Sequence, residues 1–148
     1  MGVIEEVTFN GRKITVMYEE GGKKMELFLH GDGDKVVSLA IIFLDYCGRG
    51  YIYLDIFKTR IQYRMMGYGR TLFEFFMMYM REKYPHSPIK LWAKSYNPPE
   101  DDGYTRKNRI TENEKKTILP QDLLEEFYKS YGFQVYETNG KTSMMVKV

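Results

Sequence analysis

The segment 64–70, Arg-Met-Met-Gly-Tyr-Gly-Arg, places two glycines directly before a long stretch with helical apolar spacing. The start of a helix carries unpaired backbone N–H groups and the positive end of the helix dipole. Glycine allows the backbone to approach a ligand closely. The segment therefore predicts a cradle for an anion, and a pyrophosphate suits it well. Arg64 and Arg70 would add positive charge at the rim of this cradle.

Two other interpretations of the segment were weighed. Glycines before a helix often serve only to make a tight turn between a strand and a helix, and on this motif alone that reading has equal weight. The segment lacks the third glycine of a dinucleotide-binding fingerprint, and it lacks the Gly-Lys-Ser/Thr of a P-loop. The motif by itself therefore indicates an anion site of a different kind, or a plain turn.

The elements around this segment follow from the apolar periodicity. Alternating or continuous apolar runs, bounded by glycine turns, predict strands at 3–9, 13–18, 25–29, 36–46, 51–57 and 89–94. The run 36–46 is continuously apolar, so it is expected to be buried on both faces. Apolar residues at helical spacing predict a helix over 68–84, which Pro85 ends.

The C-terminal part has its own signals. Pro120 opens a short helix that runs to Tyr131, with Leu123, Leu124, Phe127 and Tyr128 on its apolar side. Gly132 is a natural residue to end that helix. Asn139-Gly140 predicts a final hairpin. Residues 96–119 are polar and charged and are expected to form a long surface loop.

The order of elements is therefore strands, helix, strand, helix and two strands. This order predicts an α+β fold of the α/β type, with a mixed, mostly antiparallel sheet flanked by helices. A chain of 148 residues suits one domain over 1–148.

Composition excludes several classes of function. The net charge of +2, with acids and bases interspersed, does not favour nucleic acid or an anionic membrane as a partner. No apolar run is long enough to cross a bilayer. A single cysteine, Cys47, excludes an internal disulfide or a cysteine metal cage, and the isolated His30 and His86 do not make a metal site. We therefore expect no metal and a reducing, cytoplasmic setting.

Two motifs together resemble a known family. A strand, then Arg64-x-x-Gly67-x-Gly69, then a helix is similar to the acetyl-CoA-binding motif of the GNAT superfamily of N-acetyltransferases. About sixty residues later, a helical tyrosine, Tyr128, stands five residues before Phe133 in a segment that ends Gly-Phe, and this resembles a second signature of that family. The resemblance covers residues 35–148.

The resemblance implies a site. The GNAT sheet splays between the strands at 51–57 and 89–94, and the pantetheine arm of acetyl-CoA enters the gap. The residues that the resemblance assigns to the cosubstrate are Ile56, Phe57, Arg64, Met65, Met66, Gly67, Tyr68, Gly69, Arg70, Asn97 and Tyr128. The loop amides from Met66 to Arg70 would hold the pyrophosphate, and Tyr128 would lie near the thioester sulfur. An amine would attack the acyl carbonyl directly, and coenzyme A would leave.

Two side chains could assist this reaction. An amine with a pKa near 10.4 is a free base in only about one molecule in 2,500 at pH 7, so a base is needed. Asp55 is the candidate, directly or through water, and the alternative is a buried aspartate paired with a lysine or a backbone group. Tyr128 could donate a hydrogen bond to the departing thiolate, and its alternative role is core packing.

The chain also departs from the GNAT pattern. Family members usually have two helices between their first and second strands, and here glycine-broken strands take that place. Asn97 and Gln121 are both candidate counterparts of a polar residue often found before the last helix. The expected activity is acyl transfer from acetyl-CoA to an unidentified amine, and the alternative is a non-catalytic acyl-CoA-binding sensor. The apolar helix and the last strands allow a homodimer.

Overall fold

The computed structural model describes residues 3–19, 21–45, 48, 50–94, 119–140 and 142–147. The chain divides into two compact units, Met1–Leu91 and Trp92–Lys147. The prediction of a single domain, which came from chain length, stays a prediction. The polar segment at 96–119 lies almost wholly outside the described residues.

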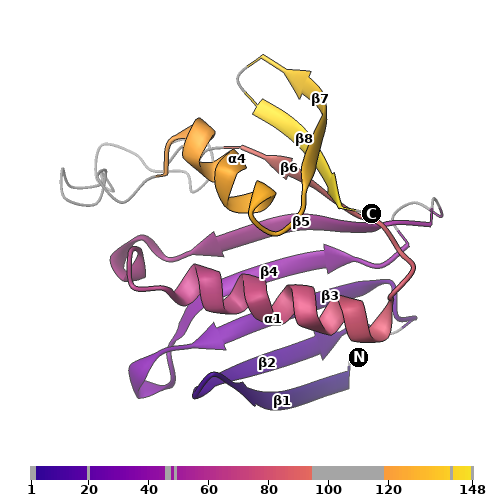
Figure 1. The fold of residues 1–148 in the computed structure, drawn as a ribbon. Coiled ribbons are helices and arrows are strands. Elements are labelled where there is room, and N and C mark those ends of the chain that lie inside the picture. Colours follow the sequence, from indigo (N-terminus) through magenta and orange to yellow (C-terminus); the bar gives the residue numbers. More distant parts are fainter. Residues whose placement is uncertain are drawn as a thin grey trace, which may run out of the picture. The chain divides into compact units, whose positions relative to one another are not determined.

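The first unit is built from antiparallel strands and one long helix (Figure 1). Its elements are β1 (Val3–Phe9), β2 (Arg12–Tyr18), β3 (Lys24–His30), β4 (Val36–Phe43), β5 (Ile52–Thr59), α1 (Tyr68–Lys83) and β6 (Ile89–Ala93), whose last two residues belong to the second unit. Strands β1 to β5 pair in antiparallel fashion with their neighbours, and β5 pairs with β6 in parallel. The expected strands at the N-terminus, in place of helices, are therefore confirmed.

The second unit contains a helix and a hairpin. Its elements are α4 (Gln121–Lys129), β7 (Gln134–Asn139) and β8 (Thr142–Lys147). Gly132 has a φ of +93° and Gly140 a φ of +62°, and such left-handed positions favour glycine. Both glycines thus act where the sequence predicts, one after the helix and one in the hairpin turn. Leu123, which was expected on the apolar side of the helix, is instead 50% exposed.

Hydrogen bonds connect the strands of the sheet in the order β1-β2-β3-β4-β5-β6-β8-β7. The sheet is mixed and mostly antiparallel, because β5 and β6 form a parallel pair among antiparallel ones. This is the predicted α+β class. None of the described helices is long and apolar enough to cross a membrane.

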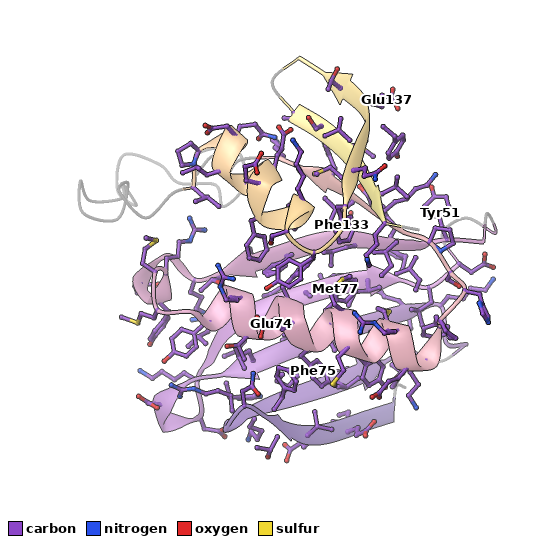
Figure 2. The ribbon with its side chains drawn as sticks, in the orientation of Figure 1. Tyr51, Glu74, Phe75, Met77, Phe133 and Glu137 are labelled. Atoms are coloured by element: carbon purple, nitrogen blue, oxygen red, sulfur yellow. The ribbon has the colours of Figure 1, made fainter. Side chains whose placement is uncertain are left out.

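Helix α1 covers one face of the first unit's sheet (Figure 1). Its buried side chains point toward the strands, and Phe75, labelled in Figure 2, meets the ring of Phe9 with centroids 5.5 Å apart. Phe73 packs against Phe57 of β5 at 5.2 Å. The fully buried strand residues under the helix include Ile14, Val16, Met25, Leu27, Leu29, Val37, Ala40, Ile42, Ile52 and Leu54.

The opposite face of the same sheet is less buried. The prediction that the apolar run at 36–46 is buried on both faces is wrong, because Leu39, Ile41 and Phe43 are only half-buried while Ile42 is fully buried. The strand also ends at Phe43. The physical reason is that α1 is the only α-helix described in this unit, and it covers one face.

This one-sided burial makes a prediction for stability. Ile42→Ala should lower the free energy of unfolding by about 2–5 kcal/mol, since it leaves a cavity under α1. Ile41→Ala, on the next residue and the other face, should cost clearly less, because part of its side chain already contacts water. Urea denaturation of both variants measures the difference. Equal losses would contradict one-sided burial.

Candidate active site

Strand β5 changes its pairing at Asp55. Ile41 of β4 lies opposite Ile56, whereas Ile42 lies opposite Leu54. Asp55 is therefore the extra residue of a β-bulge, a feature that bends a strand and re-aims its side chains. On the other edge of β5, residues Ile52 to Leu54 pair with Ile89 to Leu91 of β6. The splay between these two strands stays a prediction.

The chain then bends sharply into α1. Met65 has a φ of +66°, and Gly67 has a φ of +83°. The first helical hydrogen bond joins the Thr71 N–H to the Gly67 carbonyl, at 3.0 Å. Since the first amides of a helix have no partner one turn earlier, the N–H groups of Tyr68 and Gly69 have no acceptor within the helix. No side chain caps this helix start.

Thr59, the last residue of β5, holds the bend in place. Its hydroxyl lies 2.9 Å from the buried Ser38 hydroxyl, which also donates to the Lys58 carbonyl. Its carbonyl accepts a hydrogen bond from Arg64 Nε at 3.0 Å. Arg64 was expected to add charge at the rim of an anion cradle. Here its Nε anchors the bend to β5.

The two glycines of the segment, Gly67 and Gly69, have different structural roles. A Cβ on Gly67 would meet no atom within 4 Å, so glycine is needed there for its left-handed backbone alone. A Cβ on Gly69 would lie 3.1 Å from Thr59 Oγ1 and 3.8 Å from the Phe57 ring. Gly69 thus allows the first turn of α1 to pack closely on the end of β5. Both roles keep the exposed amides at a fixed place.

The side chains of the bend lie in two environments. Met65 and Met66 are 79% and 64% exposed. The Tyr68 ring is held from two sides, by the Arg12 guanidinium 5.1 Å above it and by the Tyr63 ring at 6.2 Å. Arg12 comes from β2, so the N-terminal strands help to fix the start of α1.

Asp55 is exposed. Its side chain has no hydrogen bond or ion pair with any residue that the structure describes. The alternative interpretation of Asp55, as a buried residue paired with a lysine or a backbone group, is therefore wrong. An exposed carboxylate at a bulge is open to a ligand or to water.

Tyr128 lies in the second unit, on α4, and is buried. Its ring makes edge contacts with the rings of Phe127 at 5.4 Å and Phe133 at 6.0 Å. Burial raises the pKa of Tyr128 well above its usual value. The phenol therefore stays neutral at physiological pH and can act only as a hydrogen-bond donor or acceptor.

Gln121 and Asn97 are the two candidates for the polar position before α4. Gln121 Nε2 donates to the Ala93 carbonyl at the end of β6, at 2.7 Å, and to Glu125 Oε2 at 2.9 Å. Asn97, the other candidate, lies outside the described residues. Gln121 thus ties the start of α4 to β6 within the second unit.

The structure places most of the predicted site residues in one unit. Asp55, Ile56, Phe57 and the segment 64–70 all belong to the first unit, and Tyr128 belongs to the second. Sequence reasoning missed Ser38, Thr59 and Arg12, which hold the bend. Thr59 lies between the predicted strand at 51–57 and the predicted turn at 64–70, and that position was the one available signal. Among the described residues, no group of three acidic, histidine or cysteine side chains could hold a metal ion.

Comparison with solved structures identifies the fold. An acyl-CoA N-acyltransferase from Pseudomonas aeruginosa matches 86% of this chain and 69% of its own, with a TM-score of 0.60 and 16% identity. Escherichia coli ElaA matches 86% of this chain and 70% of its own, with a TM-score of 0.57 and 18% identity. A protein of the GNAT family from Desulfovibrio desulfuricans, assigned as an acetyltransferase, matches 86% and 69%, with a TM-score of 0.51 and 12% identity. The fold is that of the GNAT acyltransferases.

Another GNAT-like match was solved with a ligand. A protein assigned as a streptothricin acetyltransferase, from Bacillus anthracis, is in complex with acetyl coenzyme A. It matches 98% of this chain and 83% of its own, with a TM-score of 0.55 and 11% identity. No protein-family model and no curated protein matches the sequence. The GNAT likeness is thus one of backbone arrangement.

The bend makes a prediction for stability. Gly67→Ala should lower the free energy of unfolding by about 1–2 kcal/mol, because alanine is strained in the left-handed region. Gly67→Asn should cost less, since asparagine enters that region more readily. Chemical denaturation of the two variants measures both costs. If alanine and asparagine cost the same, backbone strain does not explain this glycine.

Proposed function

We propose that the chain is an N-acyltransferase that transfers the acyl group of acetyl-CoA to an amine. The observation that carries the proposal is the left-handed bend at the start of α1, which a hydrogen bond from Arg64 to Thr59 ties to the end of β5. In the reaction the amine nitrogen bonds to the acyl carbon and the carbon–sulfur bond breaks. Coenzyme A leaves as a thiolate, and the amine releases one proton.

The bend suits the pyrophosphate of coenzyme A. The main-chain N–H groups of Gly67, Tyr68 and Gly69 can each donate to a phosphate oxygen, and a hydrogen bond to a charged group contributes roughly 1.5–3 kcal/mol. Three such bonds, with the dipole of the 16-residue helix α1, hold a diphosphate without a lysine. The anchor of Arg64 on Thr59 keeps these amides in position before the ligand arrives, which lowers the entropic cost of binding.

The part of β5 beyond the bulge is the proposed site of the pantetheine arm. Residues Ile52 to Leu54 of β5 pair with β6, and β5 continues to Thr59. Strand edges bind extended ligands through main-chain hydrogen bonds. The two amides of pantetheine can supply the complementary groups, with Ile56 and Phe57 as the strand residues nearest the bulge.

Asp55 and Tyr128 are the proposed chemical groups. The exposed carboxylate of Asp55 can accept the amine proton directly or through one water molecule. The neutral phenol of Tyr128 can donate a hydrogen bond to the thiolate, and its raised pKa disfavours full proton transfer. The role of Tyr128 rests on the resemblance between its helix and the second GNAT signature.

Binding of coenzyme A tests the cradle. Gly67→Pro should raise the Kd for coenzyme A at least tenfold in isothermal titration calorimetry, because proline cannot adopt the left-handed conformation and removes one N–H. Gly33→Pro is the matched control, since Gly33 also has an open left-handed position, at φ +75°. Pantetheine without phosphates should bind equally to both variants. Unchanged affinity for coenzyme A in Gly67→Pro would contradict the cradle.

Turnover tests the chemistry. Tyr128→Phe should lower kcat for thiol release from acetyl-CoA about 10- to 100-fold with little change in KM for acetyl-CoA, since the lost bond forms with the leaving group. Asp55→Asn should lower kcat/KM for the amine by about 100-fold. The measurement uses a panel of amines. Tight acetyl-CoA binding without turnover on any amine would instead favour a non-catalytic sensor.

A further inference from the structure

The bulge turns two consecutive β5 side chains away from α1. Leu54 is buried on the α1 face opposite Ile42, and the Phe57 ring packs on Phe73 of α1. Two residues, Asp55 and Ile56, separate these inward positions, where a regular strand would have one. Both side chains therefore lie on the sheet face that α1 does not cover.

Apolar side chains of β4 and β5 surround Asp55 on that face. Ile41 lies directly opposite Ile56, and Phe43 lies opposite Tyr53. Directly opposite residues in antiparallel strands have their Cβ atoms within about 5.5 Å. Ile56 is 37% exposed, and the other three are half-buried. Asp55, Ile56, Ile41, Phe43 and Tyr53 together form what we call the bulge patch.

The acidic residues around the bulge patch differ in whether they have an ionic partner. Glu26, opposite Ile41, is neutralised by Lys24 at 3.5 Å. Lys58 lies opposite Leu39, farther along β5. Asp55 is then the acidic group of the patch without an ionic partner among the described residues. The patch therefore presents one carboxylate beside apolar side chains.

We infer that the bulge patch binds the acceptor, and that the acceptor is a primary monoamine with an apolar body. This inference rests on the proposed acyltransferase function and names its substrate class. The ammonium group binds against Asp55 and first loses one proton to water through this carboxylate. The free amine then attacks the acyl carbon, Asp55 takes up the second proton that the nitrogen releases, and coenzyme A leaves as the thiolate. The apolar body covers Ile41 and Ile56. A polyamine would have to place its second ammonium group over the apolar side chains, where that charge has no partner.

The physical basis is the pairing of a single charge with apolar area. Burying an alkyl or aryl group on apolar side chains favours binding in proportion to the area removed from water. One methylene in an apolar site changes kcat/KM by roughly tenfold or more. The length and polarity of the amine's tail should therefore decide the rate, while its charge is needed for any reaction.

A series of amines tests the inference. Thiol release from acetyl-CoA is measured with hexylamine, 2-phenylethylamine, ethylamine, ethanolamine and spermidine. We expect kcat/KM for hexylamine and 2-phenylethylamine to exceed that for ethylamine at least tenfold. Ethanolamine and spermidine should not exceed ethylamine. Equal values across the series, or a preference for spermidine, would overturn the inference and leave the acyltransferase function intact.

A pair of matched variants tests whether the bulge patch causes the preference for amines with an apolar body. Ile41→Thr should reduce the ratio of hexylamine to ethylamine several-fold and leave the KM for acetyl-CoA unchanged. Ile4→Thr makes the same change at an exposed isoleucine of β1, three strands and about 14 Å from β4, and should leave the ratio unchanged. A ratio that survives Ile41→Thr would overturn the assignment of the patch.

Failure of the chemistry can be separated from failure of the surface. If no amine is acylated while acetyl-CoA binds, the acyltransferase function fails. Calorimetry of 2-phenylethylamine with the coenzyme A-bound protein then decides about the patch. Binding that Ile41→Thr weakens supports the surface, and absence of binding overturns it.

Discussion

A left-handed turn of the main chain at Gly67 is the constraint on which the candidate site depends. It lies directly before α1, and residues 60–67 connect this helix to β5. Thr59 stabilises the turn with two of its polar groups. Its hydroxyl forms a hydrogen bond with the Ser38 hydroxyl, and its carbonyl accepts one from Arg64 Nε. Gly69 lets the helix approach Thr59 closely. Without this set of contacts the proposed anion cradle would have no defined shape.

Local patterns were enough to predict most of the fold. Period-two runs and glycine turns located the strands to within one to three residues, and apolar spacing located α1 between Tyr68 and Lys83. Burial was harder to predict. The run at 36–46 is apolar on both sides, but whether a second layer covers a face depends on elements far away in the chain. Leu123 was misplaced for a similar reason, since nine residues of helix define an apolar side poorly.

The parts of the candidate site that depend on residues adjacent in the sequence were predictable. Glycines before a helix predict an anion cradle, and the structure places the left-handed Gly67 directly before α1. The cradle itself stays a prediction. The bulge at Asp55 was not predictable, because it arises from the register between β4 and β5. Arg64 shows the limit of charge as a signal, since its Nε donates to the Thr59 carbonyl at the end of β5. Ser38 and Arg12 gave no signal, since each looks like an ordinary strand residue.

The exposed methionines of the bend have a consequence for sequence divergence. Met65 and Met66 make the turn with their backbones while their side chains extend into solvent. A binding surface built from peptide groups constrains the path of the chain, while most of its side chains can change during evolution. The exceptions are glycines where the backbone is left-handed or packs closely. The backbone arrangement of such a surface can persist after sequence similarity has become too low to detect. Backbone likeness at 11–18% identity, with no matching family model, is the pattern that this freedom produces.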